Sequence, residues 1–186
     1  DRGRFDMEEL IDVLDENGNK TGIIKTRKEV HTTGEWHKVA FIFVVNSKGE
    51  IILQKRSAEK STNSNKWTAS ASGHLTAGDS DIEGALRELE EEIGVKAKPN
   101  ELKYLFTAKL KGKIDDKNFS HIQDIYVLYK DINIDELVLQ EEEVSEAKYV
   151  YYKDFEKMIK EENNELVEHN EIYPGVLEEL YKKFQD

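Results

Sequence analysis

The sequence contains no cysteine, which excludes disulfide scaffolds, thiolate nucleophiles, iron–sulfur clusters and zinc–thiolate sites. Basic residues are scarce: 27 lysines and arginines stand against 39 aspartates and glutamates, giving a formal net charge of −12. This charge repels phosphate backbones and anionic lipids, so we expect neither a nucleic-acid polymer nor a membrane as partner. Long apolar runs are also missing, since VAFIFVV at 39–45 is much shorter than the roughly 20 residues that span a bilayer. We therefore expect a soluble, cytoplasmic protein.

Linker signals are equally rare. Only two prolines occur among the 186 residues, and no repeat or low-complexity tract divides the chain. A chain of this length supports one domain with its own core. We predict a single domain over residues 1–186, in which residues 1–8 form a flexible N-terminal end.

Turn-forming residues predict two hairpins in the first half of the chain. Asn17-Gly18 provides the positive φ that a tight turn needs between two short strands at about 9–25. Residues 46–49 join the apolar run 39–45 to a second β-rich run, and an unbroken apolar run suits a strand covered on both faces. Further strands are predicted at 101–110, at 123–132 and before a helix at 153–162, with a terminal helix near Pro174. Strands interrupted by helices indicate a mixed α/β (α+β) layered domain.

The clearest helix signal lies between Ser80 and Gly94. Ser80 is a good N-cap with Glu83 three residues later, in a capping-box pattern, and Gly94 stands where a left-handed C-cap belongs. One apolar stripe follows helical spacing: Ile82, Leu86, Leu89 and Ile93.

Three carboxylates crowd one surface of this predicted helix. Glu88, Glu91 and Glu92 stand at positions i, i+3 and i+4, where like charges repel one another. A hard divalent cation such as Mg²⁺ or Mn²⁺ would offset that repulsion, because both ions prefer oxygen ligands and bridge carboxylates to phosphates. Arg87 is placed to orient one carboxylate. The spacing by itself is more typical of a solvated acidic face than of a metal site.

The wider segment GHLTAGDSDIEGALRELEEEIGV, residues 73–95, resembles the Nudix box. Eight of its nine defined positions match at the required spacing: Gly73, Arg87, Glu88, Leu89, Glu91, Glu92, Gly94 and Val95. Asp79 departs from the pattern, because it stands where the box has its first glutamate.

The resemblance implies a fold, a cofactor and a set of site residues. The fold is a Nudix-like mixed β-sheet sandwiched between helices, and the cofactor is Mg²⁺ or Mn²⁺ held against a diphosphate. Glu88, Glu91 and Glu92, together with Gly73, form the implied metal set, and Glu88, Glu91 and Arg87 are the implied catalytic residues. The general base stays open among Glu88, Glu91 and the run of glutamates at 141–143.

A narrower resemblance, to isopentenyl-diphosphate isomerases and their hydrolase-like relatives, covers roughly residues 9–152. It rests on histidines before the central strand, a Trp-Thr pair and the Gly-His pair at 73–74. It implies that Arg56 and Lys60 bind the diphosphate. It also implies a second metal site, with this set of ligands: His31, His37, His74 and Asp124.

Two departures from the isomerases favour hydrolysis. Their carbon acid–base chemistry uses a cysteine, and this chain has Ser72 at the matching place. Ile122 stands near one of the two acidic positions that complete their metal site. We therefore predict a metal-dependent hydrolase that cleaves the diphosphate bond of a small nucleoside-diphosphate-linked or related organic compound. Isopentenyl-diphosphate isomerisation and non-catalytic nucleotide sensing are the alternatives.

Two further features of the sequence each allow two interpretations. Trp67 either contacts substrate, by stacking on a nucleobase, or fills the core beneath the sheet. The terminal helix, with its apolar face of Leu177, Leu180, Tyr181 and Phe184, either caps the fold or supports a homodimer.

Overall fold

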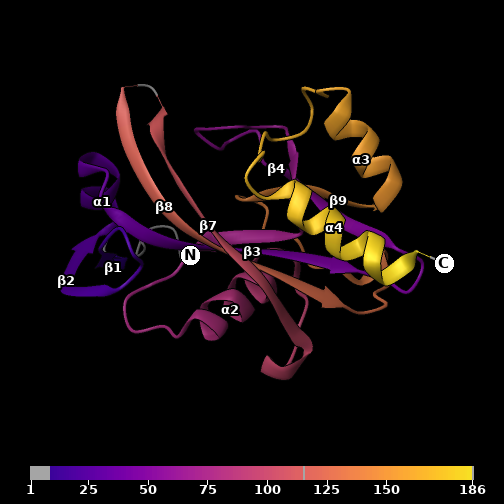
Figure 1. Cartoon of the computed structure of the whole chain (residues 1–186), viewed down its shortest axis with the longest axis horizontal. Coiled ribbons are helices and arrows are strands. Elements are labelled where there is room, and N and C mark those ends of the chain that lie inside the picture. Colours follow the sequence, from indigo (N-terminus) through magenta and orange to yellow (C-terminus); the bar gives the residue numbers. More distant parts are fainter. Residues whose placement is uncertain (1–8, 115, 186) are drawn as a thin grey trace.

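The computed structural model describes residues 9–114 and 116–185, so the predicted flexible end at 1–8 lies outside the described residues. Figure 1 shows a twisted central sheet with helices on both faces, and a small N-terminal hairpin beside it. The elements follow one another in this order: β1 (Leu10–Leu14), β2 (Lys20–Thr26), α1 (Arg27–Thr33), β3 (Trp36–Val45), β4 (Glu50–Arg56), β5 (Trp67–Thr68), β6 (Ala71–His74), α2 (Asp81–Ile93), β7 (Leu102–Ile114), β8 (Lys117–Tyr129), β9 (Val144–Tyr151), α3 (Tyr152–Lys160) and α4 (Tyr173–Phe184). Two short 3₁₀ turns, Pro99–Glu101 and Ile134–Glu136, precede β7 and β9.

β3 is the centre of the main sheet. It pairs in parallel with β8 over its full length, from Trp36 opposite Ser120 to Val45 opposite Tyr129. Its other edge pairs antiparallel with β6 and, at Val45, with β4. β4 in turn carries β5 and β9, while β7 closes the opposite edge beside β8. β1 and β2 form a separate two-stranded sheet.

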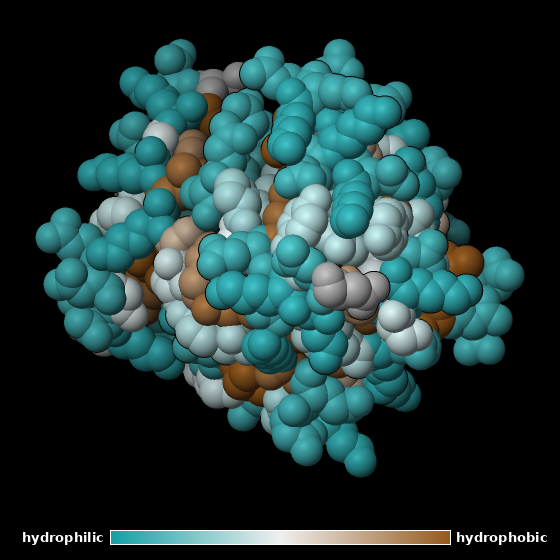
Figure 2. Space-filling view, turned by 45° about the vertical axis from the view of Figure 1, so that its right-hand side comes forward, coloured by the Kyte–Doolittle hydropathy of each residue, from teal (hydrophilic) through white to brown (hydrophobic). Residues whose placement is uncertain are grey.

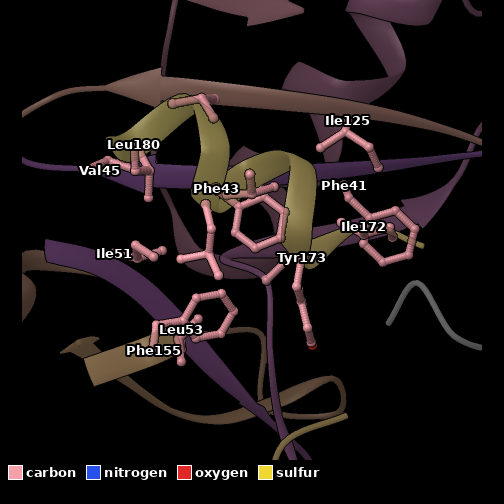
Figure 3. Close-up of a cluster of buried hydrophobic side chains, with 14 of the residues drawn as sticks. Phe41, Phe43, Val45, Ile51, Leu53, Ile125, Phe155, Ile172, Tyr173 and Leu180 are labelled. Carbon is pink, nitrogen blue, oxygen red and sulfur yellow. The ribbon is translucent and has the colours of Figure 1, made fainter. Parts of the chain in front are cut away.

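The sheet has an apolar core on each face, because β3 is apolar on both. Phe41, Phe43 and Val45 point toward α3 and α4 and pack with residues such as Tyr173 and Leu180 (Figure 3). Ile42 and Val44 point the other way, toward Ala85, Leu89 and Ile93 of α2. This sandwich confirms the predicted fold class, and it positions α2 rigidly under β6.

Most predicted elements are present, with shifted ends. The turn at Gly18 and the turn closed by Gly49 both have positive φ, as the hairpins require. α4 buries Val176, Leu177 and Leu180 against the core, which makes it part of the fold. α1 was not predicted.

Among the described residues, no helix combines the length and apolar content that crossing a membrane would require.

Candidate active site

α2 is held firmly at both ends. The Ser80 hydroxyl accepts a hydrogen bond from the Glu83 N–H at 3.2 Å, and Gly94 ends the helix in the left-handed conformation at φ 73°. A later segment of the chain contacts the last turn of α2, where the Gln140 N–H donates to the Glu92 carbonyl oxygen at 2.9 Å. The loop that carries the glutamates at 141–143 is therefore tied to the helix that carries the box glutamates.

Gly73 on β6 makes room for Glu88. A Cβ atom built at Gly73 would overlap the Glu88 carboxyl group. Glu88 is itself buried, so its carboxyl group lies directly against the β6 backbone. The glycine of the motif is thus required by a side chain on the facing helix.

Glu92 is buried between α2 and the sheet. One of its oxygens accepts from the Gln54 side chain at 2.8 Å and from the Ser72 N–H at 3.0 Å. Burial, followed by the negative charge of Glu88, raises the pKa of Glu92 well above its ordinary value. Two carboxyl groups in so confined a place are a site where a divalent cation would be strongly stabilising.

Arg87 connects the carboxylates of the box. Its guanidinium donates to Glu88 at 3.0 Å and to Asp79 at 2.8 Å, and it lies 3.6 Å from Glu91. Asp79 also accepts from the Thr76 hydroxyl at 2.7 Å. Burial opposes ionisation of Asp79, but the hydrogen bonds from Thr76 and Arg87 outweigh it and lower its pKa. The shorter aspartate therefore still makes an ion pair with Arg87.

The donor set fits a hard divalent cation. The carboxylates Glu88, Glu91 and Glu92 come from one helix face, and the Gly73 backbone adjoins them. Such oxygen ligands suit Mg²⁺ and Mn²⁺.

Of the two predicted diphosphate-binding cations, Arg56 is the last residue of β4 and Lys60 lies in the loop that follows. Arg56 donates through Nε and Nη2 to the Thr62 carbonyl oxygen, at 3.1 and 3.0 Å. Burial lowers the pKa of Arg56, and the charges of Glu143 and Glu92 oppose that shift. Lys60 makes an ion pair with Glu143.

Trp67 lies in the core. Its side chain is 7% exposed and belongs to the apolar cluster beneath α4. The Lys148 ammonium lies 4.2 Å from the centre of its ring. These contacts favour the core-filling interpretation over stacking on a nucleobase.

Three of the four predicted ligands of a second metal site come together. His31 from α1, His37 from β3 and His74 from β6 place one ring nitrogen each within 4.8 Å of the others. His37 Nδ1 donates to the Glu35 carbonyl oxygen at 2.9 Å, which leaves Nε2 as an acceptor. That Nε2 atom is buried and has no hydrogen-bond partner among the described residues. A neutral, oriented imidazole of this kind is a good transition-metal ligand.

The prediction for Asp124 is corrected by the structure. Asp124 points to the α2 face of the sheet, where it lies 3.1 Å from the Lys38 ammonium and accepts from the Thr107 hydroxyl at 2.6 Å. Since strand residues alternate between faces, the histidine face of β8 carries His121 and Gln123 instead. His121 stands opposite His37 in the parallel register, with ring centres 4.8 Å apart. Gln123 is also buried, and its Oε1 atom has no hydrogen-bond partner among the described residues.

The clustered imidazoles are held neutral. Burial is the largest cause in each case, and it lowers the pKa of His31 to about 4 and that of His121 to about 3. Burial also lowers the pKa values of His37 and His74. Neutral imidazole is the form that binds metal ions.

Comparison with known proteins identifies the same region of the chain. The sequence profile of the NUDIX domain matches residues 35–169. The chain is 35% identical to Nudix hydrolase 3 of Arabidopsis thaliana over 84% of its own length, but spans only 21% of that protein. An uncharacterised Nudix hydrolase of Clostridium acetobutylicum is 40% identical over 74% of this chain and 67% of its own.

The relatives also include isomerases. The isopentenyl-diphosphate Delta-isomerase of Serratia proteamaculans is 31% identical over 62% of this chain and 65% of its own. Among solved structures, a Deinococcus radiodurans protein superimposes with a TM-score of 0.68 at 17% identity, covering 95% of this chain and all of the other. That similarity supports the fold.

Proposed function

Because this chain belongs to the Nudix family, we propose that it is a divalent-metal-dependent hydrolase. Its substrate would be a small nucleoside-diphosphate-linked or related organic diphosphate. The observation that carries the proposal is the packing of Glu88 against Gly73, with Arg87 joining Glu88 to Asp79. This arrangement supports a role for the helix face in binding a cation rather than in facing solvent.

Each residue then has a defined task. Glu88, Glu91 and Glu92, with the Gly73 backbone, would hold Mg²⁺ or Mn²⁺, which when bound neutralises diphosphate charge and acidifies water. Arg87 orients Glu88, while Arg56 and Lys60 bind the diphosphate. Water attacks one phosphorus, a P–O bond forms as the bridging P–O bond breaks, and a base accepts the proton of the water.

Glutamine variants test this proposal. Purified protein is incubated with ADP-ribose, diadenosine tetraphosphate and isopentenyl diphosphate, with Mg²⁺ or with EDTA. We expect chelator-sensitive phosphate-containing products from at least one compound, and a loss of about 100-fold or more in kcat for Glu91→Gln or Glu92→Gln. Glu90→Gln, an exposed neighbour on the same helix, is the control. Unchanged turnover in both variants would overturn the proposal.

The isomerase alternative is tested in the same incubations. Ser72 stands where the isomerases have their cysteine, and the histidine face of β8 carries His121 and Gln123 in place of the predicted Asp124. Both features favour hydrolysis. Deuterium uptake from solvent into isopentenyl diphosphate, without phosphate release, would establish isomerisation instead. Ligand binding without turnover of any compound would indicate a sensing domain.

The histidines support a second part of the proposal. We infer that His31, His37 and His74 hold a borderline transition-metal ion, because their imidazoles are neutral and His37 Nε2 is buried without a partner among the described residues. Co²⁺ titration reads this out by visible absorption, independently of activity. His37→Ala should abolish the signal, whereas His169→Ala, outside the cluster, should retain it. An unchanged spectrum in His37→Ala would overturn the assignment.

A further inference from the structure

The ion pair between Lys60 and Glu143 joins two loops, of which the second is hydrogen-bonded through Gln140 to the end of α2. Lys60 lies in the loop between β4 and β5, and Glu143 lies just before β9. Their side chains are 20% and 35% exposed, so both are partly accessible to a ligand from solvent. A substrate diphosphate would therefore compete with Glu143 for the Lys60 ammonium.

Backbone hydrogen bonds fix the position of Glu143 on both sides. Its carbonyl oxygen accepts from the Ser57 N–H at 2.9 Å, next to the Lys60 turn. Its own N–H donates to the Gln140 carbonyl oxygen at 2.9 Å. The Gln140 N–H in turn donates to the backbone carbonyl oxygen of Glu92 at the end of α2. These bonds hold the main chain in place while the side chain of Glu143 exchanges partners.

The charge of the Glu143 carboxylate acts on two residues of the candidate site. Its negative charge contributes to raising the pKa of Glu92, after burial and the charge of Glu88. It also opposes the lowering of the Arg56 pKa by burial. Glu141 and Glu142, by contrast, are exposed. Of the three consecutive glutamates, Glu143 is the half-buried one, and it is paired with Lys60.

The three box carboxylates contact partners within the site itself. Glu91 lies 3.6 Å from the Arg87 guanidinium. Glu92 accepts from Gln54 and from the backbone of Ser72. Glu88 accepts from Arg87, which is also paired with Asp79. These contacts suit side chains that hold a cation in fixed geometry. A general base instead needs a carboxylate that can turn toward water when substrate arrives.

We propose that substrate binding transfers Lys60 from Glu143 to the diphosphate, and that the released Glu143 carboxylate is the general base of the reaction. This inference rests on the proposed hydrolase function. In the step itself, a water O–H proton passes to a Glu143 oxygen as the water oxygen bonds to phosphorus. The bridging P–O bond breaks, and its electron pair leaves with the departing phosphate group.

The competition is tested by equilibrium binding of inorganic diphosphate in the presence of Mg²⁺. Glu143→Gln frees Lys60 from its partner, so we expect the Kd to fall by about fivefold, the upper range for an accessible ion pair. Lys60→Met should raise the Kd. In the Lys60→Met background, Glu143→Gln should no longer tighten binding. Glu141→Gln and Glu142→Gln control for the general removal of negative charge.

The base role is tested by kinetics with whichever compound the wild type hydrolyses. Glu143→Gln should lower kcat by about 100-fold to 10,000-fold, in the range of general-base catalysis, while the same variant binds diphosphate more tightly. A variant that is merely damaged would not combine slower turnover with tighter binding. Glu141→Gln and Glu142→Gln should stay within about twofold of wild-type kcat.

Each result decides a separate part. Unchanged or weaker diphosphate binding in Glu143→Gln overturns the exchange of Lys60. Unchanged kcat in the same variant overturns the base role. If the wild type hydrolyses no compound, the proposed function fails and the base role with it, while the binding measurements still decide the exchange.

Discussion

At the scale of single residues, Gly73 shows how a missing side chain determines the geometry of a site. Glu88 fills the space that a Cβ atom would occupy. Gly73→Ala should therefore displace the Glu88 carboxyl group and lower kcat by about 100-fold, the cost of misplacing a catalytic group by about 1 Å. Steady-state kinetics measures this loss, and far-ultraviolet circular dichroism checks that the fold persists. Ser72→Ala adds no atom and is the matched control. Wild-type kcat in Gly73→Ala would contradict the steric argument.

Asp79 provides a test of the ion pair with Arg87. Its folded-state pKa is lowered, so the stability that it contributes is present above the unfolded pKa and is lost as the pH falls through the folded value. Asp79→Asn should cost about 1 kcal/mol at pH 7 and progressively less in acid. Urea unfolding at pH 7 and pH 3 measures both values, with Glu90→Gln as the control. An equal cost at the two pH values would contradict the ionic origin.

The sequence was sufficient to place the three glutamates on one surface of α2. It was not sufficient to assign the residues of β8 to the correct face of the sheet. On a helix, spacing alone puts Glu88, Glu91 and Glu92 on one surface. The Ser80 N-cap and the Gly94 C-cap mark the ends of that helix. On a strand, a shift of one residue moves a side chain to the opposite face. Asp124 was therefore assigned to the histidines although His121, three residues earlier, occupies their face.

At the scale of elements, α1 was missed because it is short. Seven residues are too few for a helix to be stable alone, and Val30 is its buried apolar residue. The available signal was the capping box: the Thr26 hydroxyl accepts from the Glu29 N–H at 3.2 Å, and the Glu29 carboxylate accepts from the Thr26 N–H at 3.0 Å. Because α1 carries His31, its termini help to determine the geometry of the histidine cluster.

Removing the cap tests that dependence. Thr26→Ala should destabilise the protein by about 1 kcal/mol and weaken Co²⁺ binding, because the helix that presents His31 frays. Thr32→Ala, in the same helix, removes a hydroxyl that bonds to the Lys28 carbonyl oxygen and leaves the cap intact. Thermal unfolding and Co²⁺ titration are compared for both variants. Equal effects in the two would show that the cap has no particular role.

At the scale of the whole molecule, the two cores separate the two candidate metal sites. The carboxylates belong to the α2 face of the sheet and the histidines to the opposite face, with β6 contributing to both through Gly73 and His74. The layered fold was predictable because β3 is apolar on both faces. The assignment of the two candidate metal sites to opposite faces was not predictable, because it depends on the pairing of β3 with β6 and β8. The surface in Figure 2 is mostly polar, consistent with the 35% of charged residues in the chain.

Glu92 links the stability of the whole molecule to its site. Its folded-state pKa lies well above the ordinary 4.5, so its favourable contribution is complete below that value and is lost as the pH rises through the folded pKa. The histidines with lowered pKa act in the opposite sense, since their contribution is lost as the pH falls. Comparing variants at each pH cancels the histidine effect and isolates Glu92.

In EDTA, Glu92→Gln should therefore unfold at a higher temperature than the wild type at pH 8, by at least about 2–4 °C, and the difference should shrink toward pH 5. The amide keeps an oxygen that accepts from Gln54 and Ser72, but it carries no charge against Glu88. Mg²⁺ should stabilise the wild type more than the variant, because binding to the folded state adds to its stability. Glu90→Gln, scanned in parallel by calorimetry, should follow the wild type throughout. A Glu92→Gln protein that is less stable than the wild type in EDTA at pH 8 would show that this carboxylate is not under electrostatic strain without metal.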